Sequence, residues 1–343
     1  MLYHMGIDVH DEFCSFQHID SEGSLGLSEH VPTDKHSIVN LLKQLDDPVT
    51  ITFEAGRNYW WLHELFANQP NVSQVNVVDP RRSRNLAKEL SVLSGYGRAK
   101  NDDIDAEMLA EQTRRGLAPT IHVPTAEQLE MRTVCRHRFT SVINCTRAKN
   151  TVHSILAMHG SKARIKDLLT TDLMMRRKIN KSLPYYVLFI IDDLIARINL
   201  IDKQIETCTQ KLEQMLPESH PQMQILLSHP GIGPVLGRMM HTEILETTYF
   251  NEPKYLISYS GLAPIENESA GRKGVVKLNR HCNYYLKYAF VESAHHCKDH
   301  VKYRKKYELD VRKHGKIIAK LNLARRIAKT VYWMLTRQQL YRS

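Results

Sequence analysis

The chain has 343 residues, 42% hydrophobic and 24% charged, which is the composition of a folded globular protein with room for two domains. It contains no uncharged apolar stretch of about 18 residues and no signal-peptide pattern, so neither a transmembrane helix nor a secretory leader is expected. The net charge of +10 is uneven, because residues 272–343 hold 19 Lys or Arg against 4 Asp or Glu. This basic segment suggests that the protein binds a polyanion, although a solvated helix face would give the same pattern.

The first part of the chain predicts a mixed α/β layer. Three short strands are expected at Tyr3–Val9, Phe13–Ile19 and Leu25–His30. They are followed by an amphipathic helix capped by Asp34, a strand over Val49–Phe53, a helix around Trp60–Leu65, a strand over Val75–Val78, and helices over 82–94 and 102–115. A strand meander followed by alternating helices and strands predicts a functional site at the strand ends.

The middle of the chain is expected to be almost wholly helical, since residues 126–158 and 185–216 contain neither Pro nor Gly. The second stretch carries an apolar stripe at three- and four-residue spacing, formed by Leu188, Ile191, Leu194, Ile195, Ile198, Ile201, Ile205, Cys208 and Leu212. Two explanations stay open for this stripe. It packs within one domain, or it belongs to a projecting helical hairpin that makes a dimer contact.

Pro217 and Pro221 mark the next boundary, after which a mainly helical basic segment is expected. The predicted domains are therefore 1–125, 126–216 and 217–343, an α/β domain followed by all-α segments. The glycine turn in His229–Gly237 resembles a helix-hairpin-helix, whose backbone N–H groups hold a nucleic-acid phosphate, although a plain turn would have the same sequence.

Four carboxylates are the strongest chemical signal in the sequence. Asp8 lies on the first predicted strand, Glu54 ends a later apolar strand, and Asp102 and Asp105 share one face of a helix at i and i+3. Carboxylates near a core need a counter-charge, and hard oxygen ligands suit Mg²⁺ or Mn²⁺, which in pairs promote phosphoryl transfer. Taken singly, Asp102 could be a helix N-cap and Glu54 a surface charge, and Asp103 is expected to face solvent.

The motifs around these acids resemble a known family. Gly6-Ile7-Asp8-Val9-His10, Phe53-Glu54-Ala55 and Lys100–Ala106 are similar to the three blocks of a DEDD-type, ribonuclease-H-like (RuvC-like) domain. They most resemble the insertion-sequence transposases known as bridge-RNA-guided recombinases, which include the pilin-gene invertases. Pro230–Gly233, Ser260–Pro264 and Ala324–Ala328 resemble the C-terminal transposase domain of the same family, so the resemblance covers nearly the whole chain in order.

The resemblance implies a catalytic serine in addition to the acids. Ser269 occupies the corresponding stretch, although Ala270 separates it from Gly271, and Ser258 and Ser260 are the competing candidates. The implied enzyme is a DNA transposase that cuts and rejoins strands through a serine-linked intermediate. It would use Mg²⁺ or Mn²⁺ held by the four acids, a structured guide RNA, and a homodimer or homotetramer whose protomers supply the two halves of the site.

Nucleic-acid contacts are expected mainly in the basic segment. Arg272 and Lys273 could neutralise a phosphate near Ser269. The loop at 279–283 lacks the glycine usual in the family but keeps Arg280 and Asn283. The full set of expected contacts is Gly231, Gly233, Arg272, Lys273, Lys277, Arg280, Asn283, Lys287, Arg325 and Arg326.

Two other functions remain open on the sequence alone. One is a DEDD nuclease that resolves branched DNA such as a Holliday junction with water as nucleophile, and the other is a nucleic-acid-binding protein with an inactive acidic site. The six scattered cysteines, at positions 14, 135, 145, 208, 282 and 297, form no C-x-x-C pair. They are expected to be reduced thiols of a protein in the prokaryotic cytosol or nucleoid, with no membrane partner.

Overall fold

The computed structural model describes residues 3–94, 101–164, 168, 183–265, 268–269, 272–273, 277–279 and 281–342. The chain divides into two compact units, Met1–Val123 and Pro124–Ser343, and each is described by itself. All six cysteines are free. Among the described helices, none combines the length and the apolar character that crossing a membrane requires.

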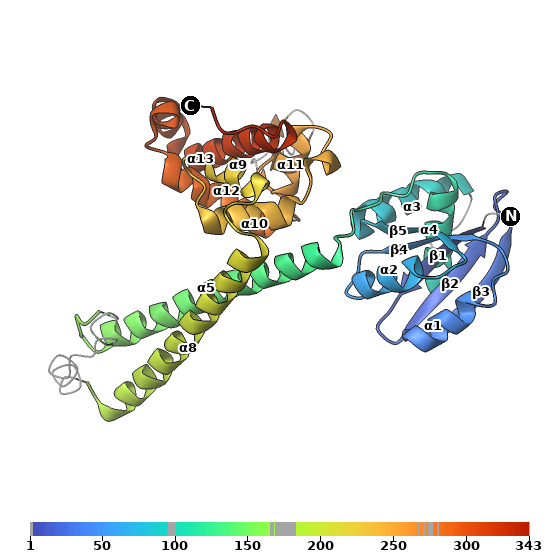
Figure 1. Cartoon of the computed structure of the whole chain (residues 1–343), viewed down its shortest axis with the longest axis horizontal. Coiled ribbons are helices and arrows are strands. Elements are labelled where there is room, and N and C mark those ends of the chain that lie inside the picture. The colour runs from blue at the N-terminus through green and yellow to red at the C-terminus, as the bar shows by residue number, and fades with distance from the viewer. Residues whose placement is uncertain are drawn as a thin grey trace. The chain divides into compact units, whose positions relative to one another are not determined.

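Unit 1 is built on a five-stranded mixed sheet with the order β3-β2-β1-β4-β5 (Figure 1). Its strands are β1 Tyr3–Val9, β2 Phe13–Ile19, β3 Leu25–Pro32, β4 Val49–Glu54 and β5 Val72–Val78. β1, β2 and β3 form an antiparallel meander, while β4 pairs in parallel with both β1 and β5. The predicted mixed α/β layer is therefore confirmed, and β5 begins three residues earlier than its apolar sequence indicated.

The two faces of this sheet differ because side chains alternate along each strand. Met5, Ile7, Ile51 and Phe53 enter an apolar core closed by α1 Lys35–Leu42 and α2 Tyr59–Ala67. Asp34 caps α1 as predicted, and its carboxylate accepts a hydrogen bond from the Ser37 backbone N–H. The opposite face presents small and polar residues to α4 Asp102–Arg114, which also contacts α3 Pro80–Ser94.

Unit 2 begins with the long antiparallel helix pair α5 Ala126–Met158 and α8 Tyr185–Met215 (Figure 1). Thr125 starts α5 with a capping box, so the helix begins at Ala126, as the Pro- and Gly-free stretch 126–158 predicted. The apolar stripe of α8 faces α5, where Ile191, Ile198 and their neighbours pack against Val152 and Leu156. The partner of the stripe is thus a helix of the same chain.

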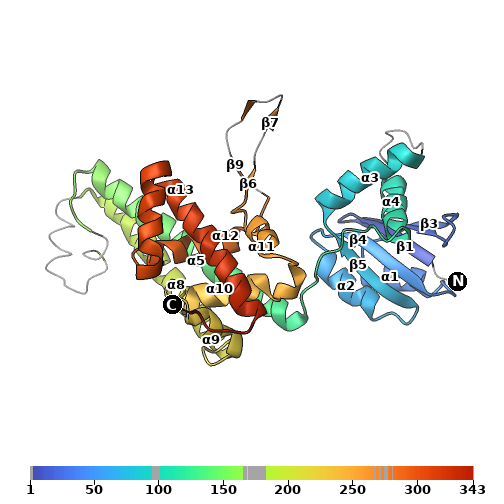
Figure 2. The ribbon, with the colours of Figure 1, turned by 90° about the horizontal axis from the view of Figure 1, so that it is seen from above.

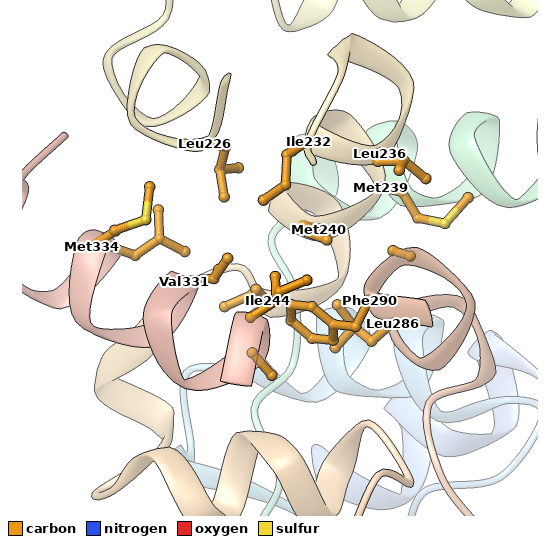
Figure 3. Packing of buried hydrophobic residues seen from close by; sticks show 14 of the residues in the cluster. Leu226, Ile232, Leu236, Met239, Met240, Ile244, Leu286, Phe290, Val331 and Met334 are labelled. Atoms are coloured by element: carbon orange, nitrogen blue, oxygen red, sulfur yellow. The ribbon is translucent and has the colours of Figure 1, made fainter. Parts of the chain in front are cut away.

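The remaining helices of unit 2 surround a second apolar core. They are α9 Pro221–Leu227, α10 Pro234–Ile244, the short 3-10 turn η1 Thr247–Tyr249, α11 Pro253–Tyr259, α12 Tyr284–Cys297 and α13 Val301–Thr336. Figure 3 shows Ile232, Met240, Phe290 and Val331 converging in this core from α13, α12 and the α9–α10 region. Phe139 of α5 belongs to the same cluster, so the base of the helix pair shares its core with the C-terminal helices.

Two very short strand pairs leave this helical body. β6 Pro264–Ile265 pairs with β9 Lys277–Leu278, and β7 Glu268–Ser269 pairs with β8 Arg272–Lys273. In Figure 2, β6 and β9 rise beside α11 and β7 lies at the outer end of the ribbon. This ribbon carries the predicted serine.

Candidate metal centre and nucleic-acid surface

Two of the four acids meet because they end neighbouring parallel strands. Ile7 of β1 is in register with Phe53 of β4, so Asp8 and Glu54 follow at the same edge of the sheet. Both side chains lie on the face opposite the apolar core, since the residues before them, Ile7 and Phe53, point into that core. The alternation along β4 therefore turns Glu54 toward α4.

The other two acids arrive on α4, which lies unusually close to β1. A Cβ atom on Gly6 would be 1.8 Å from the carbonyl oxygen of Ala106 and 2.6 Å from the amide nitrogen of Ala110. Only glycine permits this contact between a strand and a helix backbone. The first turn of α4, which contains Asp102 and Asp105, is thereby held against the end of β1. Asn101 occupies the N-cap position, so Asp102 is the first helical residue and not the cap.

His10 is a member of this cluster that sequence reasoning missed as a site residue. Its Nε2 atom lies 3.2 Å from an Asp8 carboxylate oxygen and 3.5 Å from an Asp102 carboxylate oxygen. One ligand atom from each of these three residues lies within 4.8 Å of the others, a spacing that could hold a metal ion. The signal was available, because His10 follows Asp8 by two residues at the end of the strand.

Electrostatics link all four acids. Burial raises the pKa of Asp8, and the charges of Asp105 and Asp102 raise it further, while His10 acts in the opposite direction. Burial also raises the pKa of Glu54, which Arg84 lowers and which Asp8 and Asp105 raise. Half-buried carboxylates that repel one another in this way match the donor set of a divalent cation, whose charge would remove the repulsion.

Asp103 stands apart from the other acids. Its carboxylate pairs with His30 Nε2 at 3.0 Å, and the His30 Nδ1 atom contacts the Ser15 hydroxyl at 2.9 Å. The Asp103 side chain is 40% exposed. It therefore lies partly in solvent, with a partner on β3 that the sequence did not indicate.

The three serines considered as nucleophile occupy different environments. Ser260 is buried and its hydroxyl donates to the Leu256 carbonyl oxygen, while Ser258 is an exposed residue of α11. Ser269 lies in β7, where its backbone pairs with Arg272 of β8. The side chains of Ser269, Arg272, Lys273 and Lys277 lie outside the described part of the structure, as does all of Arg280.

The two glycines of the turn before α10 differ in their surroundings, and the first, Gly231, is required for packing. The Gly231 amide donates to His229 Nδ1, and a Cβ atom there would be 2.5 Å from the Ser293 carbonyl oxygen. Gly233 differs, because it is exposed at the N-cap of α10 and no atom of the described part of the chain lies within 4 Å of its missing Cβ. Gly231 is thus unsuited to a phosphate contact through its amide, whereas Gly233 has a free approach.

Three of the polar residues expected to contact nucleic acid have internal partners. Asn283 is 8% exposed, caps α12 by accepting from the Leu286 amide, and donates to Glu243. The Arg325 guanidinium donates to the Leu262 carbonyl oxygen, and Arg326 pairs with Asp310. Their side chains therefore hold elements of unit 2 together, which sequence alone could not distinguish from an external contact. Lys287 is half-buried on α12.

Comparisons with known proteins identify the class of protein. Residues 5–159 match a DEDD-type IS110 model described as "Transposase", and residues 223–308 match one described as "Transposase IS116/IS110/IS902 family". The chain is 24% identical over 276 residues to the "Transposase for insertion sequence element IS1328" of Yersinia enterocolitica, an alignment covering 77% of each chain. It is 26% identical over 154 residues to the "Insertion element IS116 uncharacterized 44.8 kDa protein" of Streptomyces clavuligerus, covering 44% of this chain and 38% of that one.

The chain is therefore a DNA-recombining enzyme of the transposase class. More particularly, it belongs to the IS110 family of DEDD transposases.

Proposed function

We propose that this transposase cuts and rejoins the DNA strands of a mobile element through a covalent serine intermediate, assisted by a divalent metal ion. The observation that carries the proposal is the grouping of Asp8, Glu54 and the first turn of α4, with raised pKa values at Asp8 and Glu54. Isolated surface carboxylates would not repel one another in this way.

In this proposal Asp8, Glu54, Asp102 and Asp105 hold Mg²⁺ or Mn²⁺, and His10 is a further candidate ligand or counter-charge. When bound, the metal would polarise a phosphodiester and stabilise a developing negative charge. The protein's own contribution is to fix the carboxylates on two adjacent strand ends and one helix that Gly6 keeps close. A ribonuclease-H-like sheet is proposed for unit 1, supported by its mixed five-stranded order.

The proposed covalent step takes place at Ser269. Its hydroxyl oxygen attacks a DNA phosphorus, one phosphorus–oxygen bond to deoxyribose breaks, and the serine proton leaves to solvent or to a base while the departing oxygen gains a proton. Attack by a second DNA hydroxyl on the phosphoserine ester then joins the new strands and regenerates Ser269. Arg272, which pairs with Ser269 through the backbone, and Lys273 would offset the phosphate charge.

Two partners complete the proposal. A structured guide RNA, encoded near the gene, would direct the DNA choice, and a homodimer or homotetramer would bring acids and serine from different protomers to one DNA. Both follow from the family resemblance, with the long α5–α8 pair as the candidate assembly element. The reaction is proposed to take place in the prokaryotic cytosol or nucleoid. Copurification of an RNA transcribed from the flanks of the gene tests for the guide RNA. Light scattering of the full chain tests for the homodimer or homotetramer.

The decisive experiment combines cleavage with adduct detection. Duplex DNA that spans the flanks of the gene, supplied with any copurifying RNA, is incubated with the protein in Mg²⁺ and resolved under denaturing conditions. We expect metal-dependent cleavage and a protein–DNA adduct that Ser269→Ala abolishes. Cleavage without an adduct would identify a hydrolytic nuclease, and binding without any cleavage by the wild-type protein would identify a binding protein.

A further inference from the structure

α13 contains a sharp break that creates an exposed elbow. Gly315 has φ 81° and ψ 165°, a backbone region that is essentially restricted to glycine. Among the described residues, no atom lies within 4 Å of its missing Cβ, so the backbone conformation and not space requires glycine. The two halves of α13 turn back on each other here, and the ion pair of Asp310 with Arg326 ties them together.

All residues from Arg312 to Ile318 around this break are exposed. Arg312, Lys313 and Lys316 have no carboxylate oxygen within 4.0 Å among the described residues. Between them and the end of α12 lies a groove of about 380 Å³, whose lining includes Lys298, Arg312 and Lys316. The elbow is therefore a cluster of unpaired cations at a fixed turn of the chain.

Two of the acids near this groove already have cationic partners. Glu308 lines it but pairs with Arg304 at 2.9 Å, and Asp310 pairs with Arg326. Asp299, also in the lining, adds to the negative field at Arg304. The cations of the elbow consequently keep a surplus of positive charge.

Two large apolar side chains stand out next to these cations. Ile317 is 80% exposed and Ile318 is 47% exposed. Exposing isoleucine side chains to water is unfavourable. An apolar wedge flanked by cations is, however, the arrangement with which proteins enter the DNA minor groove, where the side chain unstacks a base step and the cations bind phosphates on either side.

We propose that the elbow Arg312–Ile318 is a duplex-DNA contact of this transposase, with Lys298, Arg312, Lys313 and Lys316 on phosphates and Ile317 in the minor groove. The inference rests on the proposed function only in that DNA is the substrate. Apart from Lys298, the proposed contacts lie beyond residue 308, where the match to the C-terminal transposase model ends. It also assigns binding to cations that have no carboxylate partner in the described part of the chain, in contrast to Arg325 and Arg326.

The test is equilibrium binding of the full chain to a labelled random-sequence duplex, measured by fluorescence anisotropy over a range of salt concentrations. The variant Arg312→Ala/Lys313→Ala/Lys316→Ala should bind at least about tenfold more weakly, with a salt slope lower by about one per cation removed. Lys329→Ala is the matched control, since Lys329 is an exposed lysine further along α13. It should bind as wild type does.

Ile317 gives a second, independent readout. Ile317→Ser should weaken duplex binding severalfold with an unchanged salt slope, because it removes an apolar contact and no charge. Ile317→Leu should retain binding. Because these side chains are exposed, the thermal unfolding of every variant should match wild type, which separates loss of binding from loss of fold.

The outcomes separate this inference from the proposed function. Wild-type affinity and slope in the triple variant would overturn the elbow contact while leaving the transposase function intact. Loss of binding to a structured RNA hairpin with unchanged duplex binding would also overturn it, in favour of an RNA surface. A wild-type protein that binds no DNA at all would instead contradict the proposed function.

Discussion

The His10 imidazole lies against the Asp8 carboxylate, with 3.2 Å between Nε2 and a carboxylate oxygen. It lowers the pKa of Asp8, against burial and the charges of Asp105 and Asp102, which raise it. A residue that serves as ligand or counter-charge in a metal site typically changes metal affinity by about 10–100-fold when removed. His10→Ala should therefore weaken Mn²⁺ binding by at least about tenfold, measured by calorimetry on the full chain. Unchanged affinity would exclude His10 from the site.

The four acids should be required for metal binding, and two of them, Asp8 and Glu54, should lower the stability of the metal-free protein. Asp8→Asn, Glu54→Gln, Asp102→Asn and Asp105→Asn should each reduce the thermal stabilisation by Mg²⁺ or Mn²⁺, since bound metal stabilises only the folded state. Asp8→Asn and Glu54→Gln should also raise metal-free stability at neutral pH. The folded pKa of each is raised, so ionisation at neutral pH disfavours folding.

Asp103→Asn is the control for that series, because Asp103 adjoins Asp102 but pairs with His30. It should keep the full metal-dependent shift in melting temperature. If Asp103→Asn lost this shift equally, the metal-dependent rise in melting temperature would come from general surface charge and not from a specific metal site.

Gly6 should be essential for the position of the acidic helix. Gly6→Ala places a Cβ 1.8 Å from the Ala106 carbonyl oxygen, so α4 must move away from β1. We expect a loss of at least about 3 kcal/mol in unfolding free energy and loss of metal binding. Gly56→Ala, where the nearest atom is 4.0 Å away, should be close to neutral in chemical denaturation.

Glu243 should be a major stabilising residue of unit 2. This carboxylate is 2% exposed, and it accepts two hydrogen bonds from Arg136 at 2.7 Å and one from Asn283. Glu243→Gln leaves Arg136 without its carboxylate partner, and because that guanidinium is 39% exposed the cost should be about 2–3 kcal/mol in urea denaturation. The exposed pair of Glu130 with Lys211 supplies the comparison, and Glu130→Gln should cost less than about 1 kcal/mol.

His229 should make unit 2 sensitive to acid. Its pKa is lowered from 6.5 to about 4, chiefly by burial and in smaller part by His300 and Lys302, and its ring contacts the Gly231 amide and the Tyr303 hydroxyl. Between these values the unfolded chain binds a proton that the folded chain does not. The free energy of unfolding should therefore fall as the pH drops from about 6.5 to about 4, by up to about 3 kcal/mol.

His229→Asn should remove that part of the pH dependence, leaving the contributions of the carboxylates and of His241, whose pKa is also lowered to about 4 by burial and by His220. Denaturation midpoints of both proteins at matched pH values measure the difference. Parallel pH profiles would show that folding does not lower the pKa of His229.

Periodicity in the sequence predicted most elements within a few residues, including the ends of α5 and α8. The acids could be singled out because a carboxylate at the end of a buried strand is chemically unusual. The close contact at Gly6 and the placement of His10 depend on how β1 and α4 approach, which no local pattern contains. Sequence also cannot tell an external arginine from one such as Arg325, which donates to a backbone carbonyl of the same unit.

The most direct test of the proposed chemistry is to locate the covalent link. The protein is reacted with cleavable duplex DNA in Mg²⁺, digested with nuclease and protease, and the modified peptide is sequenced by mass spectrometry. The account predicts a nucleotide attached to Ser269, formed by wild type and absent from Asp8→Ala and Asp105→Ala. A nucleotide on any other residue, or an adduct that forms equally well without metal and without these acids, would contradict it.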